Sequence, residues 1–179
     1  MKYNPKIHNR QSIRLKGWDY SHPGLYFITI CAQNRAHLFG YIENQKMHLN
    51  DAGKMIEKWY HELENKFINI KCRKYIVMPN HFHCIIEISD NYEEDAHVGT
   101  SLRGRPLKTS LFDIMDWFKT MTTNEYIRGV KNKKWQRFEK HLWQLRYWDH
   151  IIRNENDYIR IENYIINNPA TWIEDKFKK

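Results

Sequence analysis

The sequence contains few cysteines and no long apolar run. Its three cysteines, Cys31, Cys72 and Cys84, form no Cys-x-x-Cys motif, and Cys31 and Cys84 lie in apolar, strand-like runs where a thiol behaves as a small hydrophobe. This usage fits a reducing compartment. No apolar run follows Met1-Lys2, and no segment approaches the ~20 apolar residues of a membrane-spanning helix. We therefore expect a cytoplasmic protein without a secretion signal or a membrane span.

Length and charge narrow the class of protein further. With 179 residues and a mass of 22.0 kDa, residues 1–179 are expected to form a single domain with a sizeable core. The chain carries 29 Lys and Arg against 21 Asp and Glu, a net charge of +8, and 15% of its residues are aromatic. Positive charge together with aromatic rings suits phosphate contacts and base stacking. Because many soluble proteins are basic, charge alone favours nucleic acid only modestly over other anions.

Two histidines open the apolar run at residues 81–88 and mark a candidate metal site. Side chains alternate faces along a strand, so His81 and His83 should share one face, roughly 6–7 Å apart along the backbone, with Phe82 on the other. Neutral imidazole is a common ligand of divalent metals, so the pair can supply two ligands. The alternative is a chance pair of surface histidines.

A predicted helix near the end of the sequence is the second candidate element. Asn154 is suited to cap it, apolar residues recur at helical spacing, and Pro169 should end it. On this helix Tyr164 and Asn168 stand at i and i+4, so a phenol oxygen and an amide oxygen can face one point. Because proline disfavours helical geometry in the residue before it, Asn168 is expected just beyond the regular helix. A core or interfacial tyrosine is the alternative for Tyr164.

Three motifs, in their order and spacing, resemble the REP-associated tyrosine transposases, which belong to the single-tyrosine HUH transposases. The motifs are Met-Pro-Asn-His-Phe-His (residues 78–83), Leu-Trp-Gln-Leu-Arg-Tyr-Trp-Asp-His-Ile-Ile-Arg (residues 142–153) and Tyr-Ile-Ile-Asn-Asn-Pro (residues 164–169). The HUH group is named for a His-hydrophobic-His motif. The likeness runs from about residue 13 to residue 169, and the motifs together are far more specific than any one of them.

The resemblance implies a metal-dependent enzyme that cuts and rejoins single-stranded or hairpin DNA at repetitive extragenic palindromes. It implies that His81 and His83 bind Mg²⁺ or Mn²⁺ and that Asn168 corresponds to the third protein ligand. It further implies that Tyr164 is the nucleophile, with a metal and basic residues nearby to favour its phenolate. The product would be a 5′-phosphotyrosine and a free 3′-hydroxyl, which allows strand transfer. Such a protein could be a monomer or a homodimer.

At two positions the sequence differs from related patterns, and these differences bear on the alternative functions. Plasmid replication initiators share the two-histidine strand but often have Lys three residues after the tyrosine, where this chain has Asn167; this disfavours a replication or conjugation nickase. The family commonly has Trp-Gln-x-Asn-Tyr where this chain has Arg146 before Tyr147, which leaves the local DNA contacts open. A non-catalytic protein that binds single-stranded or hairpin DNA is the other alternative.

Basic residues outside the motif centres are the candidates for DNA contact. Residues 1–20 form a basic arm that either contacts phosphates or frays as a terminus. A basic run at residues 131–140 is either a single-strand track or a solvated connector. His150 is either a site residue or a structural histidine. The individual candidates are Arg14, Arg103, Arg105, Lys119, Arg146, His150 and Arg153.

The order of predicted elements indicates an α+β fold. The pattern predicts strands at residues 24–31, 70–78, 81–88 and 142–152, a hairpin at 38–49, helices at 51–66, 109–129 and 154–169, and a polar loop at 89–106. This order fits a ferredoxin-like antiparallel sheet with helices packed on one face. In that arrangement a central strand would carry the histidines and the terminal helix would cross nearby.

Overall fold

The computed structural model describes residues 15, 17–90 and 109–178. Its elements follow in the order β1 (Gly24–Cys31), η1 (Gln33–Arg35), β2 (Gly40–Glu43), β3 (Lys46–Leu49), α1 (Asp51–Lys66), β4 (Ile70–Val77), β5 (His81–Ile88), α2 (Leu111–Asn132), β6 (Trp148–Ile152), α3 (Glu155–Asn167) and η2 (Trp172–Glu174), where η marks a short 3-10 helix. Most of these boundaries lie within a few residues of the predicted ones.

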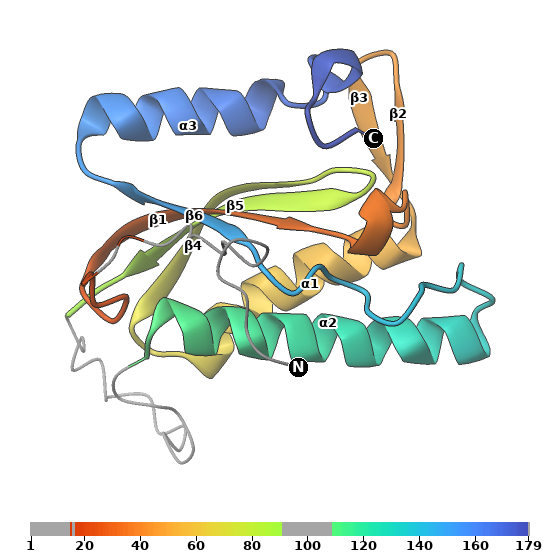
Figure 1. The fold of residues 1–179 in the computed structure, drawn as a ribbon, viewed down its shortest axis with the longest axis horizontal. Coiled ribbons are helices and arrows are strands. Elements are labelled where there is room, and N and C mark those ends of the chain that lie inside the picture. The colour runs from red at the N-terminus through yellow and green to blue at the C-terminus, as the bar shows by residue number, and fades with distance from the viewer. Residues whose placement is uncertain (1–14, 16, 91–108, 179) are drawn as a thin grey trace, which may run out of the picture.

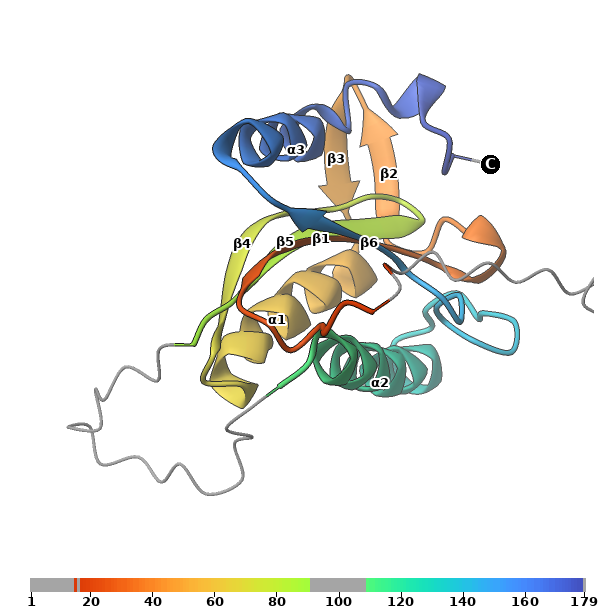
Figure 2. The ribbon, with the colours of Figure 1, turned by 60° about the vertical axis from the view of Figure 1, so that its left-hand side comes forward.

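A four-stranded antiparallel sheet in the order β4-β5-β1-β6 forms the centre of the molecule. Along the chain, helix α1 lies between the sheet strands β1 and β4 and helix α2 lies between β5 and β6, and both helices cover the same face of the sheet (Figure 1). This connection order is that of a ferredoxin-like α+β fold, which confirms the predicted fold class. The third helix, α3, lies across the opposite face, on the side toward which the β2–β3 hairpin also projects (Figure 2). The prediction that the helices pack on one face therefore holds for α1 and α2 and not for α3, whose apolar residues form a separate core with Ile85.

The sheet is buried on both faces because its central strands β1 and β5 are nearly continuous apolar runs, in which residues pointing to either face are buried. On β1, Tyr26, Ile28 and Ile30 belong to the main core against α1 and α2. A smaller core on the other face joins Ile85 of β5 to Ile161 and other apolar residues of α3. Two-sided burial is typical of strands that read as continuous apolar runs. It also fixes the face on which each histidine of β5 must lie.

Side-chain caps define where the helices begin. Asn50 accepts a hydrogen bond from the backbone N–H of Gly53 at the start of α1, at 2.9 Å. Asn154 does the same for Asp157 at the start of α3, also at 2.9 Å. Such caps stabilise a helix by about 1 kcal/mol each. At its other end α3 stops at Asn167, so Asn168 lies just beyond the regular helix as expected, although its backbone still has helical angles, with φ −55° and ψ −41°. Its side chain is buried.

The last strand is shorter than predicted, because β6 begins at Trp148 and the preceding residues pack against α2 instead. The indole of Trp143 donates a hydrogen bond to the Thr122 hydroxyl at 2.8 Å. The Nζ of Lys119 donates to the carbonyls of the next two residues of the chain, at 3.0 and 3.1 Å. A side chain of α2 thus takes up these two carbonyls, and the described segment keeps one isolated bridge, between Trp143 and Ala32, the residue after β1.

Several predictions fall wholly or largely outside the described residues. These are the basic arm apart from its last few residues, the polar loop at 89–106, and the contact candidates Arg14, Arg103 and Arg105. Across the described ranges, no helix has the length and apolarity needed to cross a membrane.

Candidate metal and nucleophile site

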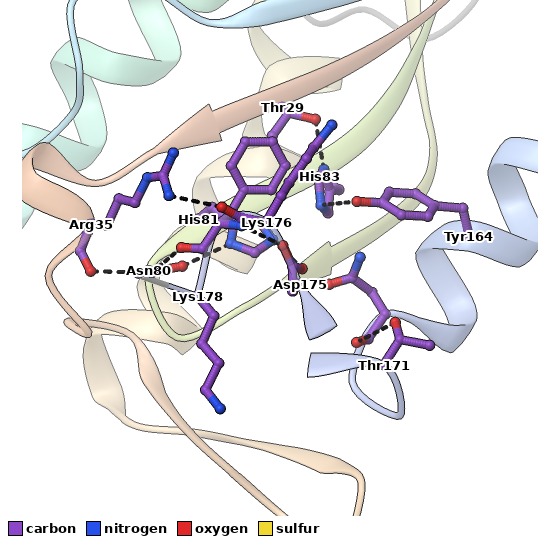
Figure 3. A network of polar contacts seen from close by, with 12 residues as sticks. Thr29, Arg35, Asn80, His81, His83, Tyr164, Thr171, Asp175, Lys176 and Lys178 are labelled. Atoms are coloured by element: carbon purple, nitrogen blue, oxygen red, sulfur yellow. Dashed lines mark hydrogen bonds and ion pairs between the residues drawn. The ribbon is translucent and has the colours of Figure 1, made fainter. Parts of the chain in front are cut away.

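The two histidines of β5 form the floor of the candidate site (Figure 3). Strand β5 is paired on both sides, by β1 and β4, so its backbone position is fixed. His81 and His83 point to the same face, as predicted, with ring centroids 4.5 Å apart. Both residues are fully buried, so the alternative of a surface histidine pair is wrong.

Hydrogen bonds to Nδ1 orient both imidazole rings. His81 Nδ1 lies 2.8 Å from Oδ1 of Asn80, whose amide nitrogen donates to the carbonyl of Phe177 at 2.7 Å. Because the Asn80 oxygen can only accept, His81 carries its proton on Nδ1 and keeps a free lone pair on Nε2. His83 Nδ1 lies 2.7 Å from the Thr29 hydroxyl on β1. Each ring therefore presents Nε2 to the space above the sheet, the arrangement expected of metal ligands with outer partners.

Asp175 is a third candidate ligand that the sequence did not reveal. One ligand atom from each of His81, His83 and Asp175 lies within 4.8 Å of the other two. The carboxylate oxygen Oδ2 of Asp175 is 3.7 Å from Nε2 of His81, and only 4% of the Asp175 side chain is exposed. Two imidazoles and one carboxylate form a donor set that divalent metals bind readily.

Side chains from η1 and from the residue before β5 bond to the backbone of the segment that carries Asp175. Besides the Asn80 bond to the Phe177 carbonyl, the Arg35 guanidinium donates to the carbonyl of Lys176 at 2.8 Å. The Phe177 ring packs on His81, with ring centroids 5.1 Å apart. These contacts explain how a carboxylate so far along the chain reaches the histidines.

Several buried polar atoms at this point have no hydrogen-bond partner among the described residues and could coordinate a divalent cation. Nε2 of His81, Oδ2 of Asp175 and both amide atoms of Asn168 are buried and lack a hydrogen bond of good geometry among the described residues. Buried polar atoms are normally paired, and leaving them unpaired is costly. The side chains of His81, His83 and Asp175, together with the Asn168 oxygen that was predicted as a ligand, therefore suit a bound cation.

Burial sets the charge of these groups in a way that favours metal binding. It lowers the pKa of His81 to about 3, and burial followed by the neighbouring His81 charge holds the pKa of His83 well below its usual range. Both rings are therefore neutral at pH 7, as ligation requires. Burial raises the pKa of the Asp175 carboxyl, while a hydrogen bond from the Phe177 backbone N–H opposes this. A bound cation would compensate the cost of a buried carboxylate.

Tyr164 reaches the histidines from α3. Its hydroxyl lies 3.3 Å from Nε2 of His83, and its ring meets the Phe27 ring edge-on with centroids 6.0 Å apart. The tyrosine is 38% exposed, so its oxygen is open to a ligand as well as to the site. Burial and then the Asp175 charge raise the Tyr164 pKa. The protein's own groups thus keep the phenol protonated, opposite to the direction expected from nearby basic residues.

A cleft of about 650 Å³ opens over the tyrosine. Successive turns of α3 supply Arg160, Tyr164 and Asn168 to its wall, and β6 supplies His150. Arg160 was not singled out in the sequence, although its place four residues before Tyr164 puts it on the same helix face. Asp175 lines the same cleft.

The other predicted DNA contacts are scattered. Arg153 lines a separate hollow together with Pro23 and Tyr158. Arg146 is exposed, and Lys119 bonds to backbone carbonyls after Trp143, which gives it a structural role. Their contacts with DNA stay predictions, as does the basic run at residues 131–140.

Comparison with known sequences finds one close relative and two distant ones. No protein-family model matches the chain. An uncharacterized protein of Haemophilus influenzae is 37% identical over 183 residues, covering 98% of this chain and 96% of that protein. A second Haemophilus influenzae protein, provisionally named a REP-associated tyrosine transposase, is 26% identical and covers 85% of this chain and 73% of its own length. The REP-associated tyrosine transposase of Escherichia coli K12 is 24% identical, with coverages of 87% and 73%.

Among solved structures, the chain is similar to a REP-associated tyrosine transposase bound to a REP hairpin. The two share 20% sequence identity with a TM-score of 0.57, over 89% of this chain and 73% of that one. This likeness supports the fold described above.

Proposed function

We propose that this chain, which belongs to one family with the uncharacterized Haemophilus influenzae protein and has REP-associated tyrosine transposases among its distant homologues, is a metal-dependent single-strand DNA transposase or endonuclease. Its substrate is single-stranded or hairpin DNA of repetitive extragenic palindromes. Support comes from the homologues' names and, independently, from the convergence of a tyrosine with two buried histidines.

The metal-binding groups in this proposal are His81, His83 and Asp175, with the Asn168 oxygen beside them. Thr29 and Asn80 hold the two rings so that Nε2 faces the site. When bound, Mg²⁺ or Mn²⁺ would offset negative charge on a non-bridging phosphate oxygen, which otherwise repels an attacking nucleophile.

Tyr164 is the proposed nucleophile. Its oxygen forms a bond to phosphorus as its phenolic proton leaves, and the bond from phosphorus to the neighbouring 3′-oxygen breaks. That oxygen departs with the electron pair and takes up a proton, which gives a free 3′-hydroxyl and a 5′-phosphotyrosine. Because one phosphate ester replaces another, a 3′-hydroxyl from the same or another strand can reverse the step. The α3 helix, packed on the sheet through Ile161 and Ile165, keeps the tyrosine at the site.

One observation carries the proposal: the Tyr164 hydroxyl lies 3.3 Å from Nε2 of His83 across a long separation in sequence. The motif at residues 78–83 and the motif at residues 164–169 are therefore in contact in space. A phenol this close to an imidazole that faces a candidate metal site supports an attack on a phosphate bound there.

A labelled hairpin oligonucleotide with single-stranded flanks, incubated with Mn²⁺ or Mg²⁺ and run on a denaturing gel, tests the proposal. We expect a metal-dependent covalent adduct that is lost in the variant Tyr164→Phe. Binding without an adduct across a varied panel of hairpins would instead support a non-catalytic DNA-binding protein. An adduct on Tyr158 or Tyr147 would show that the nucleophile is assigned wrongly.

A further inference from the structure

A chain of three polar side chains lies at the end of the cleft near the start of α3. Nε2 of His150, on β6, is 2.7 Å from one carboxylate oxygen of Asp157, and the Arg160 guanidinium is 2.5 Å from the other. The Asp157 carboxylate therefore links His150 on the strand to the Arg160 guanidinium on the helix. The metal site and the nucleophile use none of these three groups.

The carboxylate at the centre of this chain is firmly placed. Asp157 lies in the first turn of α3, where its backbone N–H donates to the Asn154 cap. Partial burial alone would raise the Asp157 pKa, but hydrogen bonds from His150 and then Arg160 outweigh it and lower the pKa. Asp157 is therefore charged at neutral pH and can hold the guanidinium in one orientation.

The guanidinium remains largely free to bind something else. The Arg160 side chain is 66% exposed, and it has five N–H donors, of which the contact with Asp157 occupies only part. An exposed pair of this kind adds little to stability, so the fold itself does not require it. Arg160 also lines the cleft with Tyr164, one helical turn away, at roughly 5–6 Å between Cβ atoms.

We propose that Arg160 binds the backbone phosphate next to the scissile one, and that Asp157 and His150 position it. The inference rests on the proposed function, since it places a second phosphate of the same strand in the same cleft. A planar guanidinium with several free donors is suited to a phosphate, which accepts two parallel hydrogen bonds. Binding the adjacent phosphate fixes the strand's direction, so that the correct phosphorus meets the Tyr164 oxygen.

The test measures binding separately from cleavage. A labelled hairpin oligonucleotide with single-stranded flanks is titrated into the Tyr164→Phe protein, which cannot form the adduct. Each flank phosphate is replaced in turn by a neutral methylphosphonate. At one linkage next to the cleavage point, the replacement is expected to weaken binding about tenfold. This is the loss expected when a single charge-assisted hydrogen-bonded contact is removed.

Arg160→Gln, combined with Tyr164→Phe, identifies the protein partner of that linkage. The natural oligonucleotide should bind about tenfold less tightly, and the sensitive linkage should become insensitive to the methylphosphonate. The slope of log K against log salt should become shallower by about 0.7, the value for one phosphate contact on a single strand. Arg128→Gln, at an exposed arginine of α2 on the other side of the sheet, should leave the whole pattern unchanged.

Asp157→Asn tests the positioning role. This variant should bind the oligonucleotide less tightly through the same linkage, by a smaller factor than Arg160→Gln, because the guanidinium is no longer held by a charged carboxylate. Tighter binding would show that Asp157 only repels the strand and would overturn its positioning role. If Arg160→Gln keeps every methylphosphonate penalty while the wild-type protein forms its adduct, the phosphate site is wrong and the proposed function stands. If the linkage pattern follows Arg160 but no adduct forms in the wild type, the contact between Arg160 and a backbone phosphate stands, whereas its place next to a scissile phosphate and the nucleophile assignment both fail.

Discussion

The Asp175 carboxylate lies 3.7 Å from Nε2 of His81, and both side chains are almost completely buried. A neutral imidazole and a carboxylate at this distance do not make a direct hydrogen bond. Each is left with an unpaired atom, which a shared cation would satisfy.

Replacing this carboxylate should weaken metal binding. Asp175→Asn keeps the shape but removes the negative charge, so the affinity for Mn²⁺, measured by calorimetry, should fall by at least about tenfold. The rise in melting temperature that Mn²⁺ gives the wild-type protein should shrink accordingly, since binding to the folded state stabilises it by mass action. Glu174→Gln, at the exposed neighbouring carboxylate, is the matched control and should behave as wild type. Equal Mn²⁺ affinity in Asp175→Asn would remove this residue from the ligand set.

The hydroxyl of Thr29 should matter to the metal through His83. Thr29→Val removes the partner of His83 Nδ1 at nearly constant volume, whereas Thr29→Ser keeps it. Loss of such an outer partner typically lowers metal affinity about 10–100-fold. We therefore expect Thr29→Val to bind Mn²⁺ more weakly and to give less adduct, with Thr29→Ser close to wild type. Matching behaviour of the two variants would mean that the hydroxyl does not orient the ring.

The buried histidines should make the metal-free protein sensitive to acid. Burial lowers the folded-state pKa of His81 to about 3, below the ordinary histidine value of about 6.5. Between these values the unfolded chain binds a proton that the folded chain does not, so the free energy of unfolding falls as the pH falls. The slope is about 1.4 kcal/mol per pH unit for each such histidine.

Urea unfolding at pH 7, 6 and 5 with a chelator present checks this expectation. His81→Gln carries no titrating ring, so its stability should depend less steeply on pH than that of the wild type. Parallel slopes for the two proteins would show that His81 can be protonated in the folded state.

Docking of α3 should depend on its buried face and not on its exposed one. Ile165 is fully buried and Ile166 is 52% exposed, so the two neighbours form a matched pair. Ile165→Ala should lower the free energy of unfolding by about 2–5 kcal/mol, the usual cost of deleting a large buried aliphatic group. Ile166→Ala should change it by less than about 0.5 kcal/mol. If urea unfolding gives similar values for both, α3 does not pack on the sheet through Ile165.

Local pattern was enough to predict the elements that hold the site. Strand alternation placed His81 and His83 on one face, and helical spacing placed Tyr164 and Asn168 on one side of a helix that Asn154 caps. Their contact in space could be expected only from the resemblance and from the fold that the order of elements indicates, because no periodicity relates β5 to α3. The structure shows that contact directly.

The position of Asp175 and the start of β6 depend on contacts between distant residues, which the local spacing of apolar and polar residues does not predict. Asp175 follows the last recognised motif. It reaches the histidines because Asn80 and Arg35 bond to carbonyls of its own segment and Phe177 packs on His81. The shortened strand β6 has a similar origin, since Lys119 on α2 takes up the carbonyls that a neighbouring strand would otherwise bond. Both outcomes come from side chains far away in the sequence.

The candidate ligands come from the middle of the chain and from its final segment. An ion coordinated by both His81 and Asp175 would therefore cross-link the chain and close a long loop that contains α2, β6 and α3. A cross-link that closes a long loop lowers the conformational entropy of the unfolded chain more than one that closes a short loop. Extracting the ion should accordingly release the residues after α3 before it loosens the sheet.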